Sequence, residues 1–214
     1  MTSFDRQKLA LLATLLLMVV SLRNALFPAE QWLQHTPTVL MLLGLLWSTN
    51  RARLSSISFA CAISFVVLHI IGARWIYSNV PYDAWCESLT GMSLSEQFGW
   101  QRNHYDRLVH FASGCFGVPV ALDWLKQTWD ASHSNDSFPK RWGWFLSLCV
   151  VMAVGAAYEV LEWQIAMFFS PAQAEAYNGQ QGDVWDAQKD LCLAGMGGLL
   201  AIGIHWIWSE FRRD

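Results

Sequence analysis

The sequence is poor in charged residues, which make up 14% of its 214 positions, whereas soluble domains carry about 25%. Hydrophobic residues make up 54% of the chain. This balance excludes an ordinary water-soluble surface and indicates an integral membrane protein. The formal net charge of -3 gives no basic excess, so nucleic acid is not an expected partner.

The five cysteines form no recognisable motif. They stand at positions 61, 86, 115, 149 and 192, with no CxxC pair and no histidines at zinc-finger spacing. The chain also lacks a Ser–His–Asp or Cys–His nucleophile signature, a phosphate-binding loop and an internal repeat. Neither a disulfide framework nor a familiar nucleophilic enzyme is therefore indicated.

Long apolar segments dominate the chain, and a membrane-spanning helix needs about 20 mostly apolar residues. We predict an all-α polytopic membrane helix bundle in a single domain, residues 1–214, with about six transmembrane helices at 9–27, 36–48, 57–77, 108–125, 142–169 and 187–208. The segment 36–48 is short for a full crossing. Arg6 and Lys8 precede the first segment, as in a secretory signal. No small-x-small cleavage site precedes Pro28, so we expect a retained anchor.

The basic residues favour cytoplasmic N- and C-termini, because basic residues concentrate in cytoplasmic loops. With that orientation the inner segments contain nine of them: Arg6, Lys8, Arg51, Arg53, Lys126, Lys140, Arg141, Arg212 and Arg213. The outer segments and outer helix ends contain five: Arg23, Arg74, Arg102, Arg107 and Lys189. We therefore expect a multi-pass protein of the bacterial inner membrane, with the lipid bilayer as its partner.

This topology brings the polar residues of the apolar segments to the outer, periplasmic side. The fourth and sixth helices run inward from RNHYDRLVHFASG (102–114) and GDVWDAQKD (182–190), and the fifth runs outward through YEVLEWQ (158–164). The residues that share this depth are His69, Asp106, Arg107, His110, Glu159, Glu162, Gln164, Asp183, Asp186, Lys189 and Asp190. We expect them to form one outward-facing polar site.

Residue spacing supports this convergence, because residues three or four apart share a helix face. That spacing occurs in Asp106 with His110, in Glu159 with Glu162, and in the stripe of Asp183, Asp186 and Asp190. Small residues follow on the same sides of the fourth and sixth helices: Ser113, Gly114 and Gly117, and Ala194, Gly197 and Gly198. Small residues let membrane helices approach closely, so we expect tight packing beneath the polar site.

Each of these residues also has a structural interpretation. Asp183 and Asp186 suit an N-cap and the first turn of a helix. His110 could be a hydrogen-bonded core residue, and Arg107 could extend outward to the interface. Asp190 lies a turn deeper, where a carboxylate costs about 2.5–3.5 kcal/mol and needs a partner or a function.

The charges of the cluster do not balance, because six carboxylates face Arg102, Arg107 and Lys189. Either some carboxylates are protonated or a divalent cation, Mg²⁺, Mn²⁺ or Zn²⁺, is bound. The candidate metal ligands are Glu159, Glu162, Asp183, Asp186, Asp190 and His110. The candidate catalytic residues are Asp106, His110, Glu159, Glu162, Asp186 and Asp190, and the candidate substrate-binding residues are Arg102, Arg107, Gln164 and Lys189.

The motifs RNHYDRLVHFASG, EVLEW and QGDVWDAQKDLCLAGMGG together closely resemble the YjdF-type inner-membrane proteins of bacteria. Their order is also similar, more distantly, to a VanZ-like pattern of D-K-x-x-H-F, E-x-x-Q and R-x-x-D-x-x-D, which implies a role in glycopeptide-antibiotic tolerance at the cell surface. Here Arg107 replaces the lysine, the Glu–Gln spacing differs and the arginine of the third element is missing. The resemblance implies a helical membrane fold and marks the residues above, and it implies no reaction.

Three functions fit these residues. The first is an enzyme or binding protein for an amphiphilic, lipid-linked substrate, whose head group would meet the site while its tail stays in the bilayer. The second is an ion- or proton-coupled transporter, since intramembrane carboxylates and histidines also mark ion pathways. The third is a structural or accessory subunit whose polar cluster only holds helices together. A cavity that reaches only the outer face favours the first, a continuous polar path the second, and a fully paired dry cluster the third.

Overall fold

The chain is helical throughout the part that the structure describes. The computed structural model describes residues 2–51, 54–132, 138–168 and 177–211. Its long helices are α1 (Ser3–Ser21), α2 (Pro28–Asn50), α3 (Ser56–Arg74), α6 (Tyr105–Ser132), α7 (Lys140–Phe168) and α9 (Asp186–Phe211), and its short helices are α4 (Tyr82–Thr90) and α5 (Leu94–Phe98). These residues contain no strand, as the predicted all-α class requires.

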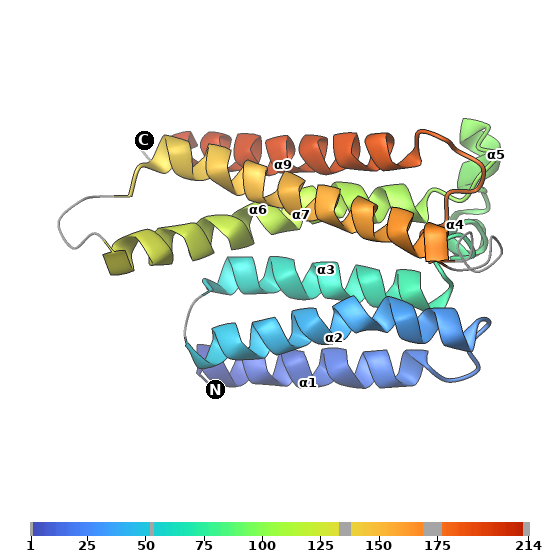
Figure 1. Ribbon diagram of the computed structural model, residues 1–214, viewed down its shortest axis with the longest axis horizontal. Helices are drawn as coiled ribbons and strands as arrows, with labels where there is room; N and C mark the ends of the chain where they lie inside the picture. Colours follow the sequence, from blue (N-terminus) through green and yellow to red (C-terminus); the bar gives the residue numbers. More distant parts are fainter. Residues whose placement is uncertain (1, 52–53, 133–137, 169–176, 212–214) are drawn as a thin grey trace.

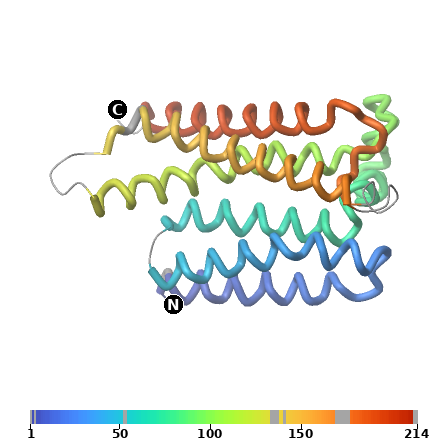
Figure 2. The backbone as a smooth tube through the Cα atoms, viewed as in Figure 1, coloured from blue at the N-terminus to red at the C-terminus, as the bar shows by residue number. Residues whose placement is uncertain are grey.

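The long helices lie side by side in two groups (Figure 1). α1, α2 and α3 pack against one another, as do α6, α7 and α9, and the contact of α3 with α6 joins the groups. Successive long helices run in opposite directions, as the course of the backbone in Figure 2 shows. α4 and α5 lie at one end of the bundle, called the α4 end below, and both chain ends lie at the other.

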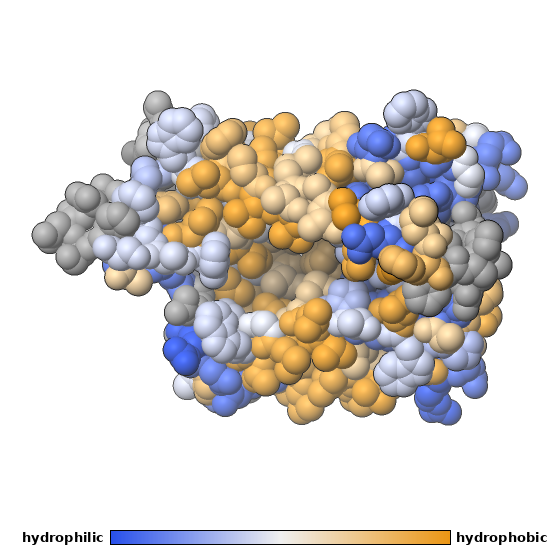
Figure 3. Space-filling model, viewed as in Figure 1, coloured by the Kyte–Doolittle hydropathy of each residue, from blue (hydrophilic) through white to orange (hydrophobic). Residues whose placement is uncertain are grey.

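Four helices are long and apolar enough to cross a membrane. They are α3, α6, α9 and the part of α7 from Trp142 to Phe168. Large apolar side chains cover much of the outer surface of the molecule (Figure 3), and Leu12, Trp142 and Ile207 are among those with more than half of their area exposed. Exposing so much apolar surface to water is unfavourable, so this surface is suited to contact with lipid.

The N-terminal helices differ in length from the predicted apolar segments. α2 has 23 residues, from Pro28 to Asn50, where the sequence predicted only 36–48, and α1 ends at Ser21 rather than at position 27. Proline suits the first position of a helix, where its missing N–H costs nothing. The first turns of α2 carry polar side chains that the sequence pattern did not assign to the membrane. Gln31, Gln34 and His35 are at most 1% exposed, so they face the protein interior rather than lipid.

Close packing of α6 on α9 holds the C-terminal group together. A Cβ atom added at Gly114 would overlap the backbone of Ala194, and one added at Gly197 would overlap the carbonyl of Phe111. Gly114, Ala194 and Gly197 of the small-residue stripes expected from the sequence thus form the contact of these helices, whereas Gly117 faces Val151 of α7 and Ser113 lines a cavity. This contact also brings the first turns of α6 and α9 together at the α4 end of the bundle.

Candidate functional site

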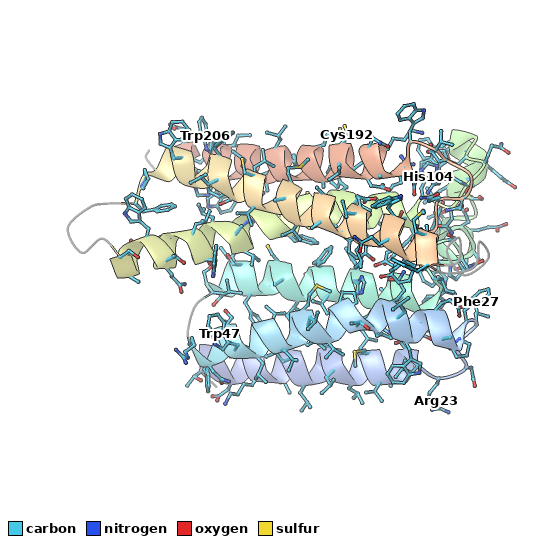
Figure 4. The ribbon with its side chains drawn as sticks, viewed as in Figure 1. Arg23, Phe27, Trp47, His104, Cys192 and Trp206 are labelled. Atoms are coloured by element: carbon cyan, nitrogen blue, oxygen red, sulfur yellow. The ribbon has the colours of Figure 1, made fainter. Side chains whose placement is uncertain are left out.

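The predicted polar residues gather at the α4 end of the bundle, where α3 and α7 end and α6 and α9 begin. His104, which immediately precedes α6, is labelled at this end in Figure 4. A pair of hydrogen bonds fixes the chain before α9 to the chain before α6. The Asn103 backbone N–H donates to Gln181 Oε1 at 2.8 Å, and Gln181 Nε2 donates to the Asn103 carbonyl at 3.1 Å.

The outer part of the site is an ion-paired group, called the outer cluster below. Arg107 donates to Asp183 and to Asp186 at 2.8 Å each, and Arg102 donates to Asp186 at 2.6 Å. Lys189 donates to Asp183 at 2.6 Å. Three cations therefore face two carboxylates, and the outer cluster keeps a net positive charge.

Asp183 stays ionised over the whole physiological range. Hydrogen bonds from Lys189 and from the Trp185 backbone N–H lower the pKa of Asp183 from 3.8 to about 2, and Arg107 adds to the effect. The hydrogen bond from the Trp185 backbone N–H to Asp183 Oδ1 is 3.1 Å long and closes a turn just before α9. Asp183 is therefore not the N-cap that its structural interpretation expected, because α9 begins three residues later at Asp186. It lies in the turn before the helix and binds the basic residues.

A second group lies deeper and is called the inner cluster: Asp106, His110, Glu159, Glu162 and Asp190. His110 Nε2 lies 3.6 Å from Asp106 Oδ1 and 3.7 Å from Glu159 Oε1. One ligand atom from each of Asp106, His110 and Asp190 lies within 4.8 Å of the other two. These three residues form a group that could hold a metal ion.

Unpaired oxygens distinguish the inner cluster from the outer one. Asp190 is 2% exposed, and its Oδ1 has no hydrogen-bond partner among the described residues. The same holds for Glu159 Oε1. Leaving a buried charged oxygen unpaired is costly, and such atoms usually mark a water, an ion or a function. The inner cluster contains four carboxylates and no lysine or arginine, so the charge imbalance expected from the sequence is concentrated here.

A cavity of about 650 Å³ runs from the inner cluster into the bundle between α2, α3, α6 and α7. Asp106, His110 and Glu162 line it at the α4 end, and most of its other lining residues are apolar, such as Met41 and Val120. Figure 3 shows a hollow on this face of the molecule, between the two groups of helices. The cavity therefore joins a polar site to an apolar, laterally accessible space.

The structure brings together most of the residues expected at the site. His110 lies beside Glu159 and Asp190, as the equal depth of their helices predicted. Gln164 is the exception, because it is exposed on α7 and has no hydrogen bond to the other candidate residues in the described part of the chain. His69 lines the cavity, but both ring nitrogens have partners, the Gln34 carbonyl and the Tyr77 hydroxyl.

Several cavity residues were missed by the sequence analysis: Tyr77, Tyr158, Tyr177 and Asn178. Tyr77 follows α3 in a turn with left-handed backbone at Ile76 (φ 49°) and Tyr77 (φ 50°), which directs the chain back toward the cavity. Asn178 precedes α9 by eight residues and binds the Glu162 carbonyl through its Nδ2 at 3.1 Å. A sequence pattern contains no signal for either position, since both depend on irregular turns.

The helical fold, the lipid-facing surface and the buried acidic and histidine cluster define a multi-pass membrane protein. The chain belongs to the family described as predicted membrane protein (DUF2238), whose model matches residues 7–211. It is similar to the inner membrane protein YjdF of Escherichia coli (strain K12), with 28% identity over 172 residues, which cover 80% of this chain and 75% of the relative. No solved structure matches it. The chain is therefore a multi-pass inner-membrane protein that lies in the lipid bilayer.

Proposed function

We propose that this protein binds an amphiphilic, lipid-linked molecule from the periplasmic side of the inner membrane and holds a divalent cation against its head group. The observation that carries the proposal is the cavity of about 650 Å³, which is apolar along most of its length and ends at Asp106, His110 and Glu162. An amphiphile matches such a space, because its hydrocarbon part replaces apolar contacts and its head group meets the polar end.

The proposed cation lies at Asp106, His110 and Asp190. Two carboxylates and one imidazole suit Mn²⁺ or Zn²⁺. Mg²⁺ would use the two carboxylates and water molecules as its oxygen ligands. The buried Asp190 Oδ1 supports this position, because no described residue donates a hydrogen bond to it and a cation would satisfy it. Glu159 and Glu162 would complete the negative charge around the ion.

When no ion is bound, His110 is proposed instead to carry a proton between the site and the bound molecule, because a ring nitrogen that ligates a metal cannot also take up a proton. Its Nε2 lies between Asp106 and Glu159, so either carboxylate can accept or return the proton. In this arrangement Asp183 and Asp186 stay ion-paired and orient Arg102 and Arg107, while Lys189 and the exposed Gln164 lie at the edge where a head group would enter. The net positive outer cluster would attract a phosphate toward the ion.

The proposal also includes six membrane-spanning helices in one integral membrane domain, with both chain ends in the cytoplasm. α1 and α2 have 19 and 23 residues, about 28 and 35 Å at 1.5 Å per residue, which is enough to cross a core of about 30 Å or nearly so. The chain ends lie at the end of the bundle opposite to α4, and the sequence assigns nine of the fourteen basic residues to the segments on that side. The site would then open to the periplasm.

The two rival functions are less well supported. A transporter needs a polar path to the other side, whereas the cavity is lined toward the opposite end by residues such as Leu45, Ala121 and Trp124. A purely structural cluster should hydrogen-bond all its members, whereas Asp190 Oδ1 and Glu159 Oε1 are buried and accept no hydrogen bond from the described residues. Both observations favour a binding site.

Thermal melts of the purified chain in detergent test the cation. We expect EDTA-treated wild type to gain about 5–10 °C in Tm with one of Mg²⁺, Mn²⁺ or Zn²⁺ near 100 times its Kd. Asp190→Asn should melt near the metal-free wild type and not respond, because the amide keeps the shape and loses the charge. Asp130→Asn, at an exposed position near the other end of α6, is the control. An ion-indifferent wild type would refute the cation site.

A cavity-filling pair tests the amphiphile. Ala62 lines the cavity, whereas Ala60 is exposed on the same helix. Mass spectrometry of the purified chain should find bound phospholipid on wild type and on Ala60→Trp, and much less on Ala62→Trp. Equal lipid on all three would show that the cavity is not its site.

A further inference from the structure

One subsite of the cavity, beside the inner cluster, is rich in hydrogen-bond acceptors and aromatic rings. It is formed by Tyr77, Tyr158, Glu162, Tyr177 and Asn178, all of which line the cavity. Asn178 binds the backbone of Glu162, Tyr158 binds Tyr177, and Tyr77 is close enough to Glu162 to interact with its charge. Gly179 lies against Ser78, which places Asn178 beside Tyr77.

Asn178 offers a buried acceptor with no partner. The residue is 4% exposed, and its Oδ1 has no hydrogen-bond partner among the described residues. Its Nδ2 donates to the Glu162 carbonyl, which can only accept, so the amide orientation is fixed and Oδ1 keeps its full acceptor capacity. A buried amide oxygen without a partner requires a donor from a bound molecule or water.

The hydroxyl of Tyr77 is also limited to accepting. His69 Nε2 lies 3.0 Å from the Gln34 carbonyl, so the ring hydrogen of a neutral imidazole is on Nε2. Nδ1 is then an acceptor, and the Tyr77 hydroxyl hydrogen is used in the hydrogen bond to it. The remaining lone pairs of the Tyr77 oxygen can only receive a donor.

The charge of this subsite excludes an anion and favours a cation. Glu162 is its charged member, Asp106 is nearby, and none of the described residues that line the cavity is lysine or arginine. Three acceptors, Glu162, Asn178 Oδ1 and Tyr77 Oη, match the three N–H donors of a primary ammonium group. Tyrosine rings further stabilise an ammonium ion by cation–π contact.

We infer that this subsite binds the primary ammonium group of a zwitterionic aminophospholipid, an ethanolamine-type head group. The inference rests on the proposed function, in which the phosphate of the same head group faces the cation at Asp106, His110 and Asp190. The inference specifies the class of head group, because a glycerol head group has no positive charge that could pair with Glu162. A quaternary choline head group has the charge but no N–H for Asn178 and Tyr77.

Titration of the full chain in detergent with Mg²⁺ present tests the subsite, using three lysophospholipids with one acyl chain and ethanolamine, choline or glycerol head groups. We expect the ethanolamine lipid to bind wild type about tenfold or more tighter than the other two. Tyr77→Phe should remove most of this preference while leaving the affinity for the glycerol lipid nearly unchanged. Glu162→Gln should also remove the preference, together with part of the affinity for all three lipids, because Glu162 also adds negative charge around the ion. Glu87→Gln, on an exposed face of α4, should retain it.

The outcomes separate the two proposals. Equal affinity for all three lipids, or tighter binding of the glycerol lipid, overturns the ammonium subsite and leaves the amphiphile site standing. A preference that persists in both cavity variants also overturns the subsite. Failure of every lipid to bind wild type overturns the subsite and the proposed function together. The preference of the wild type needs no variant to fold, so the test does not depend on their stability.

Discussion

The Nε atom of Arg107 lies 3.8 Å from Oδ1 of Asp190, too far for a hydrogen bond, although Nη2 of the same guanidinium binds Asp183 and Asp186 at 2.8 Å. Arg107 Nε and Asp190 Oδ1 are both buried without a hydrogen-bond partner among the described residues. The guanidinium is therefore held by the outer cluster and stops short of the inner one. This gap is the boundary between ion pairs that stabilise the fold and carboxylates that stay available for a ligand.

Arg107→Gln should destabilise the protein more than Lys189→Gln, although both remove one cation from Asp183. Arg107 and Asp186 have side chains 13% and 6% exposed, so Asp186 would lose one of its two buried partners. We expect the free energy of unfolding to fall by about 2–3 kcal/mol. A buried charge left with no partner costs about 3–5 kcal/mol, and the loss is smaller here because Arg102 still binds Asp186. For a chain of this size the Tm would fall by roughly 5–10 °C.

Lys189→Gln is the matched control for that variant. The Lys189 side chain is 50% exposed, and exposed pairs contribute about 0–1 kcal/mol. A double variant, Arg107→Gln with Asp186→Asn, should recover part of the loss, because the carboxylate that lacked a partner is then neutral. Equal melting temperatures of the two single variants would contradict the larger contribution predicted for the buried Arg107 pair.

Gly197→Ala should disrupt the contact of α6 with α9. The new Cβ would overlap the carbonyl of Phe111, and a backbone atom cannot move aside as a side chain end can. We expect at least about 1–3 kcal/mol of destabilisation or poor membrane yield. A Cβ added at Gly203 in the same helix has no neighbouring atom within contact distance, so Gly203→Ala should raise the free energy of unfolding by up to about 1 kcal/mol through its higher helix propensity. Melting curves in which both variants shift alike would contradict this packing.

The sequence predicted the C-terminal group of helices better than the N-terminal group, for a physical reason. In α6 and α9 the polar residues lie at one end and the small residues follow at helical spacing, so periodicity alone placed His110 and Gly197. In α2 the buried Gln34 and His35 precede the apolar run, and hydropathy cannot distinguish a polar residue that faces the interior from one in a loop. The predicted segment therefore began too late.

The composition of the candidate site was also only partly predictable. The charge count showed that carboxylates exceed cations, but it could not assign the cations to particular carboxylates. That assignment depends on the turn at Asp183 and on the reach of Arg107, which are set by three-dimensional contacts. Tyr77 and Asn178 enter the cavity from irregular segments, for which the sequence has no periodic signal.

Reporter fusions should place the C-terminus in the cytoplasm and the region around Gly91, which ends α4, in the periplasm. The expectation follows from the excess of basic residues that the sequence assigns to the segments on the side of both chain ends. Green fluorescent protein should fluoresce at the C-terminus and after Arg51, and alkaline phosphatase should be active after Gly91. An alkaline phosphatase fusion active at the C-terminus would contradict the orientation and place the site on the cytoplasmic side.

The stability of the folded protein should decline as the pH falls below about 6.5, and His104 should contribute to that decline. Burial lowers the pKa of His104 below its ordinary 6.5, and the charges of Arg102 and Arg107 lower it further. At a pH between the folded and unfolded pKa values of His104, the unfolded chain binds a proton at this residue and the folded chain does not. The contribution of His104 to stability is therefore fully present above pH 6.5 and is lost as the pH falls below it.

His104→Asn removes that proton while keeping a polar side chain, so its Tm should depend less on pH than the wild-type Tm does over the same range. The measurement is a series of melts of both proteins in matched buffers, with the difference between the two curves as the readout. Contributions from all other titrating groups are common to both proteins and cancel in that difference. Parallel curves would mean that His104 binds its proton equally in the folded and unfolded chains, and that the arginines beside it are too well neutralised by Asp183 and Asp186 to repel a third positive charge.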